Sequence, residues 1–114
     1  MILEDYGKSF LILTFELIMN LDQNDIEIVH NMPDNRFEVI LEEKKAILIY
    51  MIRKSLFIII HTEVPPPYEG QRIAANLNRA ALNYAKKEGY KVRSYCSYTT
   101  MYIERNLEYA ALLG

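Results

Sequence analysis

Three side chains in this 114-residue sequence could take a direct part in group-transfer chemistry. Cys96 is the only cysteine, and it directly precedes a segment predicted to be helical, where the first helical N–H groups favour a nucleophilic thiolate. Tyr102 could act as a general acid through its phenol. His61 could act as a base, because an imidazole exchanges a proton near neutral pH. Glu63 would share a strand face with His61 and could orient it.

Each of these residue types also has an ordinary structural role. A lone cysteine such as Cys96 is often a small buried hydrophobe. A helical tyrosine usually packs against its neighbours, and this chain has nine tyrosines. A strand histidine often makes a hydrogen bond within the sheet, and His30, at a predicted strand end beside a turn, is expected to be structural. The residue types alone therefore leave both interpretations open.

The segment 63–74 links a very apolar strand to the longest amphipathic helix, and it is the best candidate for a binding loop. Three prolines at 65–67 cannot donate hydrogen bonds to a sheet, so the strand must end or splay there. Gly70 lets the backbone turn, and the helix is expected to begin at Gln71 or Arg72. The N–H groups of a first helical turn have no internal partner and attract anions, so this loop could hold a phosphate. An ordinary strand-to-helix loop is the alternative.

The elements that must position these residues follow from the hydrophobic pattern. A mixed α+β domain is predicted, in which four strands form an antiparallel meander and a fifth lies parallel to the fourth after a helical crossover. The third and fourth strands are nearly continuous apolar runs, as expected for strands covered on both faces. Gly89 should cap the first helix and Ser97 the second. The predicted strands are residues 26–30, 36–41, 45–53, 56–64 and 91–96, and the predicted helices are residues 72–88 and 97–106.

The run YEGQRIAANL resembles the acetyl-CoA pyrophosphate loop of the GNAT acetyltransferases, whose pattern is Q/R-x-x-G-x-G/A. With HTEVP before it and CSYTTMYIERNLEY after it, the chain is similar to the short, single-domain GNAT-like acetyltransferase family over about residues 26–112. The resemblance implies a GNAT-like fold in which the last two strands splay into a V that holds acetyl-CoA. It implies contacts to that cofactor from Val64, Gly70, Gln71, Arg72, Ile73, Ala74 and Ala75.

The resemblance also bears on the reactive side chains. MYIERN is similar to the stretch that carries the general-acid tyrosine of many GNAT enzymes, which implies that role for Tyr102. The short family places a cysteine where Cys96 stands, which implies either an acetylated nucleophile or a thiol that lines the pantetheine tunnel. Two positions depart from the superfamily pattern. Glu69 stands in place of Gln or Arg, and Arg72 stands in place of the central Gly, where it would either obstruct the phosphates or add a charged fork to them.

Composition limits the remaining functions. The length fits one domain, and the net charge of −2 gives no basic surface for nucleic acid. The two histidines and one cysteine lie too far apart in sequence for a metal site. A single cysteine excludes an internal disulfide and fits a reducing cytoplasm.

Residues 1–24 are expected to form an apolar extension, which could be helical, and residues 25–114 are expected to form the GNAT-like domain. The stretch 10–19 is too short to span a membrane and contains Glu16, so neither a membrane anchor nor a signal peptide is expected. A helix that packs on the domain or on a partner fits better, and such a helix could pair two copies into a homodimer. Initiation at Met19 is a further alternative.

These observations predict a small acetyl-CoA-dependent acyltransferase that passes the acetyl group to an amine acceptor of unknown identity. The rival prediction is a CoA-binding or protein-interaction module without turnover. Arg72 in the phosphate loop and the apolar extension both favour the rival.

Overall fold

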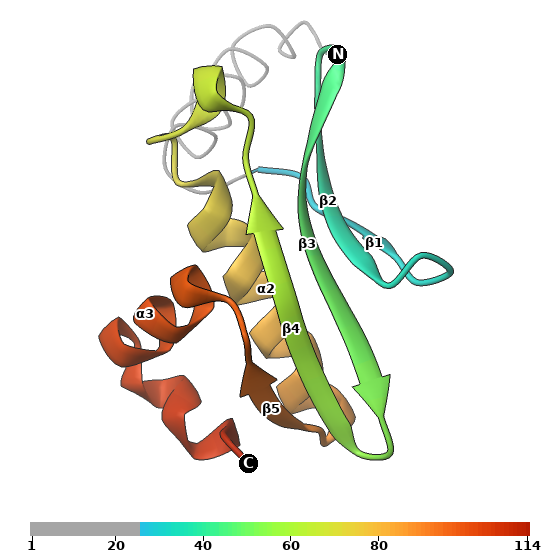
Figure 1. Ribbon diagram of the computed structural model, residues 1–114, viewed down its shortest axis with the longest axis vertical. Coiled ribbons are helices and arrows are strands. Elements are labelled where there is room, and N and C mark those ends of the chain that lie inside the picture. The colour runs from blue at the N-terminus through green and yellow to red at the C-terminus, as the bar shows by residue number, and fades with distance from the viewer. Residues whose placement is uncertain (1–25) are drawn as a thin grey trace, which may run out of the picture.

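The computed structural model describes residues 26–114, and the predictions for the N-terminal extension lie outside these described residues. A sheet in the order β1-β2-β3-β4-β5 runs through the domain (Figure 1). Strands β1 to β4 pair antiparallel, and β5 pairs parallel to β4, which confirms the predicted topology. The strands are β1 (Val29–Asn31), β2 (Arg36–Leu41), β3 (Lys44–Arg53), β4 (Leu56–Glu63) and β5 (Lys91–Ser94).

The first and last strands are shorter than predicted. β1 begins only at Val29, because its pairing with β2 covers three residues, from Val29 opposite Glu38 to Asn31 opposite Arg36. β5 ends at Ser94 instead of residue 96, because the chain turns there toward the next helix. The other strands lie within one residue of their predicted bounds. Alternation and apolar runs thus located the strands, while their ends depended on where a partner was available.

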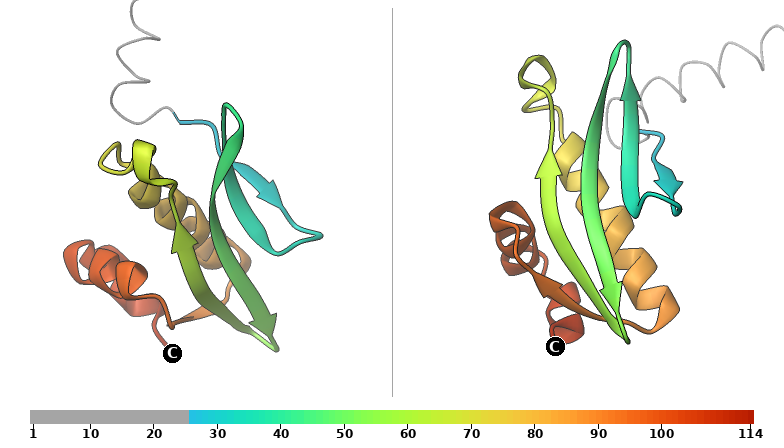
Figure 2. Two further views of the ribbon diagram at one scale, coloured as in Figure 1. Left: turned by 45° about the horizontal axis from the view of Figure 1, so that its top comes forward. Right: turned by 45° about the vertical axis from the view of Figure 1, so that its right-hand side comes forward.

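Helix α2 (Ile73–Glu88) covers one face of the sheet (Figure 2). Its residues Ile73, Leu77, Ala81 and Ala85 recur every fourth position and are buried, so they form the stripe that faces the strands. Gly89 ends the helix in the left-handed conformation, with φ 81°, and its N–H bonds to the carbonyls of α2's last turn. This confirms the predicted glycine cap.

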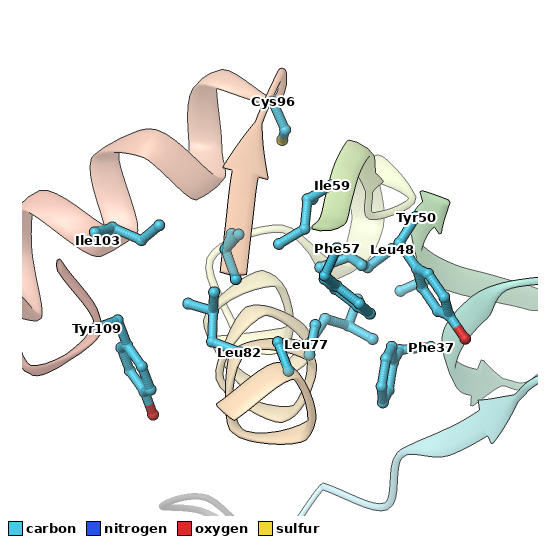
Figure 3. Close-up of a cluster of buried hydrophobic side chains, with 14 of the residues drawn as sticks. Phe37, Leu48, Tyr50, Phe57, Ile59, Leu77, Leu82, Cys96, Ile103 and Tyr109 are labelled. Carbon is cyan, nitrogen blue, oxygen red and sulfur yellow. The ribbon is translucent and has the colours of Figure 1, made fainter. Parts of the chain in front are cut away.

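The core between α2 and the sheet is rich in aromatic side chains (Figure 3). Phe57 is fully buried, and its ring lies 4.5 Å from the ring of Tyr50. His30 stacks on Phe37 at 4.0 Å, and its Nε2 lies 2.8 Å from the Tyr50 hydroxyl. Burial lowers the pKa of His30. These contacts place His30 in the packing of the sheet, as the sequence suggested.

The opposite face of the sheet is only partly covered by the described residues. Ile58 is buried, but Met51 and Ile60 are each more than a third exposed. The prediction that β3 and β4 would be buried on both faces is therefore met only in part.

The chain ends in helix α3 (Ser97–Arg105) and the 3-10 helix η2 (Leu107–Leu112). The Tyr109 hydroxyl donates to Asn83 Oδ1 on α2 at 2.8 Å, which ties η2 to the main helix. Gly114 N donates to Val92 O at 3.0 Å, so the chain end pairs with β5. Among the described helices, none is long and apolar enough to cross a membrane.

Candidate functional site

The parallel pairing of β4 and β5 stops halfway along β4. It runs from Leu56 opposite Lys91 to Ile59 opposite Ser94, and its last bond joins Tyr95 N to Ile59 O at 2.9 Å. β4 continues for four more residues and stays paired with β3 as far as Glu63. The two strands therefore part in a V. The opening begins where β5 ends. The prolines follow further along the chain and end β4 itself, so they do not cause the opening.

A cavity of about 720 Å³ lies between the end of β4, the following loop and α3. Seven of the residues predicted from the sequence line it: Val64, Gly70, Arg72, Ile73, Ala74, Ala75 and Tyr102. Gln71 does not line it. Gln71 lines a neighbouring cavity of about 710 Å³ on the other side of the loop, beside β2.

The loop between β4 and α2 is built by proline and by left-handed backbone. Pro66–Tyr68 form the 3-10 helix η1, in which Tyr68 N donates to Pro65 O at 2.8 Å. Gly70 follows with φ 85°, and Arg72 has φ 65° and ψ 15°. Arg72 is the N-cap of α2, and no side chain among residues 26–114 caps this helix end. The first-turn N–H groups of α2 are thus available to an anion in the cavity.

Two guanidinium groups add positive charge to the cavity wall. Arg72 reaches it from the loop and Arg105 from the last turn of α3. Burial raises the pKa of Tyr98, and Arg105 and Arg72 partly offset this rise, so both cations act on the same phenol. Two cations beside an open helix N-terminus suit a polyanionic ligand.

Cys96 lies between β5 and α3, at the inner end of the V (Figure 3). It is buried and serves as the N-cap residue of α3, so Ser97, which was predicted to cap this helix, is its first helical residue. Burial by itself would raise the pKa of the Cys96 thiol. Hydrogen bonds from Thr62 and from the α3 residues Thr99 and Tyr98 outweigh burial and lower that pKa. The site therefore favours a thiolate.

Tyr102 lies on the cavity face of α3, with its ring 6.5 Å from Tyr98 and 6.1 Å from Tyr109. Burial, followed by the effect of Tyr109, raises the pKa of Tyr102, although Arg79 opposes this. The phenol thus keeps its proton at neutral pH, as a general acid must.

His61 lies away from Cys96 and Tyr102. Its side chain is 55% exposed, and its Nε2 is 3.6 Å from Glu63 Oε1, the neighbour predicted to share its face. Thr62, the next residue of β4, lines the cavity, whereas His61 does not. Of the three reactive side chains predicted from the sequence, only Tyr102 lines the cavity. Cys96 is buried behind the lining residue Thr62, and His61 lies outside the lining.

Sequence reasoning missed several residues of this site. Thr62 was not identified as a site residue, and neither were the side chains from α3 other than Tyr102. A signal was present, because the α3 residues that line the cavity have the spacing i, i+3, i+4 and i+7, which is one face of a helix. They are Tyr98, Met101, Tyr102 and Arg105.

Comparison with known proteins shows the family of this chain. The family described as GCN5-related N-acetyl-transferase matches residues 36–112, and the chain belongs to this family. Protein NATD1 of Gallus gallus is 33% identical over 84 residues, which are 71% of this chain and 76% of that protein. Protein NATD1 of Homo sapiens is also 33% identical over 84 residues, 71% of this chain and 74% of that protein.

A solved structure also shares the fold. The NMR solution structure of a GCN5-like protein from Staphylococcus aureus superposes with a TM-score of 0.63 at 22% identity, over 79% of this chain and 89% of that chain.

Among residues 26–114, no three His, Cys, Asp or Glu side chains gather in a way that could hold a metal ion.

Proposed function

We propose that this protein is an acetyl-CoA-dependent acyltransferase that passes the acetyl group to an amine acceptor. The observation that carries the proposal is the V between β4 and β5, which opens into a cavity at the N-terminus of α2, where no side chain of residues 26–114 caps the helix. Cys96 lies behind the cavity wall, with its Sγ 3.5 Å from Oγ1 of the lining residue Thr62, and its thiol pKa is lowered. The N-terminus of α2 would bind the phosphates of a thioester-linked polyanion, and the Cys96 thiolate would react with its thioester.

The residues present fit acetyl-CoA. A Cβ placed on Gly70 would meet no atom of residues 26–114 within 4 Å, so these residues leave the loop backbone open to an approaching phosphate. The first turn of α2, with Arg72 and Arg105, would hold the phosphates, and the backbone around Val64 would contact the pantetheine arm. Gln71 would contribute from the outer side of the loop. Bound acetyl-CoA supplies an activated thioester.

In this proposal, Cys96 is the nucleophile and Tyr102 the general acid. The Cys96 thiolate forms a new bond to the acetyl carbonyl carbon, the original carbon–sulfur bond breaks, and the departing thiolate takes its proton from the Tyr102 phenol. A neutral amine then attacks the acetyl-cysteine carbonyl carbon, the carbon–sulfur bond breaks to restore the Cys96 thiolate, and the surplus proton of the amine returns to the Tyr102 phenolate. His61 would serve as a base only for an amine that approaches from the exposed side of β4. We infer that such a free thiol works in the reducing cytoplasm.

The test is the intact mass of the protein after incubation with acetyl-CoA. One acetyl mass is expected on wild type, and none on Cys96→Ala. Because Cys96 is the only cysteine, loss of the adduct in neutral hydroxylamine identifies it as a thioester. A calorimetric titration with acetyl-CoA, beside dephospho-CoA, checks binding separately.

The outcomes distinguish the proposal from its rival. Saturable binding without an adduct, and without release of CoA to any amine tested, would favour a CoA-binding module without turnover. The absence of binding at millimolar acetyl-CoA would contradict both.

A further inference from the structure

A cluster of polar side chains lies next to the cavity, and hydrophobic packing gives no reason for polar residues there. Asn78 lies in the middle of α2 and Thr99 in the first turn of α3, and both side chains are fully buried. Polar side chains at such positions need hydrogen-bond partners, because burial removes them from water. Asn78 bonds to both Thr99 and Thr62, and Thr62 in turn contacts Cys96. We call these three residues the polar cluster.

The orientation of the Asn78 amide follows from one backbone carbonyl. Asn78 Nδ2 lies 2.9 Å from Ala74 O. A carbonyl oxygen can only accept, so the amide nitrogen must face it, and the amide oxygen must face the other way. That oxygen contacts Thr99 Oγ1. Because the amide oxygen also can only accept, the Thr99 hydroxyl must donate to it.

This orientation determines the direction of the next bonds. The second proton of Asn78 Nδ2 points to Thr62 Oγ1 at 3.3 Å, so the Thr62 oxygen acts there as an acceptor. Thr62 Oγ1 also lies 3.5 Å from Cys96 Sγ. Once the thiol has lost its proton, the sulfur can only accept, and the Thr62 hydroxyl proton is free to point to it.

We propose that Asn78 and Thr62 are positioning residues that hold a hydroxyl proton on the Cys96 sulfur and thereby stabilise its thiolate. The proposal deepens the proposed function, on which it rests, because it explains how a cysteine buried away from any ion pair could act as the nucleophile. A hydrogen bond to a charged group is roughly twice as strong as one between neutral groups.

The other groups around Cys96 act in the same direction or at a distance. Burial raises the pKa of the Cys96 thiol, and besides Thr62 it is opposed by hydrogen bonds from the backbone and side chain of Thr99 and from the backbone of Tyr98, all in the first turn of α3. No charged side chain of the described residues contributes to that shift. The cations of the cavity, Arg72 and Arg105, act on Tyr98 instead. From β4, the contribution comes from Thr62 alone.

The experiment is the pH profile of Cys96 alkylation by iodoacetamide, followed by intact mass. The chain has one cysteine, so the mass change reports Cys96 alone. The midpoint of the profile reports ionisation, and the plateau at high pH reports access to the sulfur. Thr62→Val, which keeps the shape but removes the hydroxyl, should move the midpoint to higher pH and slow the reaction at neutral pH about tenfold, with the plateau retained.

Two further variants complete the test. Thr62→Ser keeps a hydroxyl and should restore most of the wild-type profile. Asn78→Leu, similar in volume, should move the midpoint in the same direction as Thr62→Val, and circular dichroism melts would show that it folds. An unchanged midpoint in folded Thr62→Val would overturn the proposal. A lower plateau with an unchanged midpoint would also overturn it, because Thr62 would then control only access.

The readout does not depend on acetyl transfer. A shifted midpoint without an acetyl adduct on wild type would contradict the proposed function and leave the polar cluster's role intact. An acetyl adduct with an unshifted midpoint would contradict only the role of the polar cluster.

Discussion

Arg72 holds a backbone conformation that most side chains avoid. Its φ of 65° and ψ of 15° lie in the left-handed region. The GNAT pattern has its central glycine at this position, and glycine adopts that region without steric cost. The loop thus has a glycine-type backbone conformation at a position that carries a cation. The sequence could not decide whether Arg72 would obstruct the loop, because an arginine, unlike a proline, does not fix its own φ.

Replacing Arg72 by glycine should leave the fold unharmed or stabilise it. We expect Arg72→Gly to raise the free energy of unfolding by up to about 1 kcal/mol, because the relief of the left-handed strain outweighs the extra freedom of glycine in the unfolded chain. Urea unfolding measures this change. Arg72→Ala keeps the strain and serves as the control, so equal stability of the two variants would show that the backbone is not strained.

At the scale of elements, α2 has a left-handed glycine at each end of its sequence. Gly70 precedes the helix with φ 85°, and Gly89 follows it with φ 81°. A Cβ at either position would meet no atom within 4 Å. A side chain at either position would therefore meet similar backbone strain and similar open space. Only Gly70, however, lines the candidate cofactor cavity.

Because the two positions are alike, alanine substitutions at them can distinguish an effect on stability from an effect on acetyl-CoA binding. Gly70→Ala and Gly89→Ala should each lower the free energy of unfolding by about 1 kcal/mol, because alanine resists a positive φ. Only Gly70→Ala should also weaken acetyl-CoA binding, since its methyl group would stand in the loop that faces the phosphates. Urea unfolding and calorimetry give the two quantities. Equal loss of affinity in both variants would place the effect in the general stability of α2.

The elements also show how far the sequence could predict the site. Periodicity located α2 and α3 within one residue at each start, and motif resemblance located the loop that lines the cavity. The sequence could not locate the end of β5, because Tyr95 and Cys96 continue the strand-like pattern and only the turn into α3 removes them from the sheet. It also gave no reason to connect Asn78 with Cys96, since that link passes through Thr62 on a third element.

At the scale of the whole molecule, His30 makes the stability of the fold depend on pH. Its ring is stacked on Phe37, and burial lowers its pKa from 6.5. The unfolded chain then binds more protons than the folded chain at pH values between the lowered pKa and 6.5. Stability is full above this window and is lost as the pH falls through it.

A thermal melt series tests this dependence. Wild type should melt at a lower temperature at about pH 5.5 than at about pH 7.5. His30→Phe should show a smaller difference between the two melting temperatures, because its side chain at position 30 does not titrate. The phenylalanine keeps the stacking on Phe37 but leaves the Tyr50 hydroxyl without its partner, so its melting temperature at neutral pH need not equal that of wild type. An undiminished difference in His30→Phe would assign the pH dependence to other groups.

The short parallel pairing of β4 and β5 also has a kinetic consequence. Each of its four residue pairs, such as Leu56 with Lys91, joins positions 35 apart in sequence (91 − 56), whereas the meander of β1 to β4 joins near neighbours. Pairings that close long loops form slowly, because their entropy cost comes before their contacts. The meander can therefore assemble first and α2 can dock on it, while the V is completed late in refolding. Competence to bind acetyl-CoA should accordingly lag behind the recovery of secondary structure.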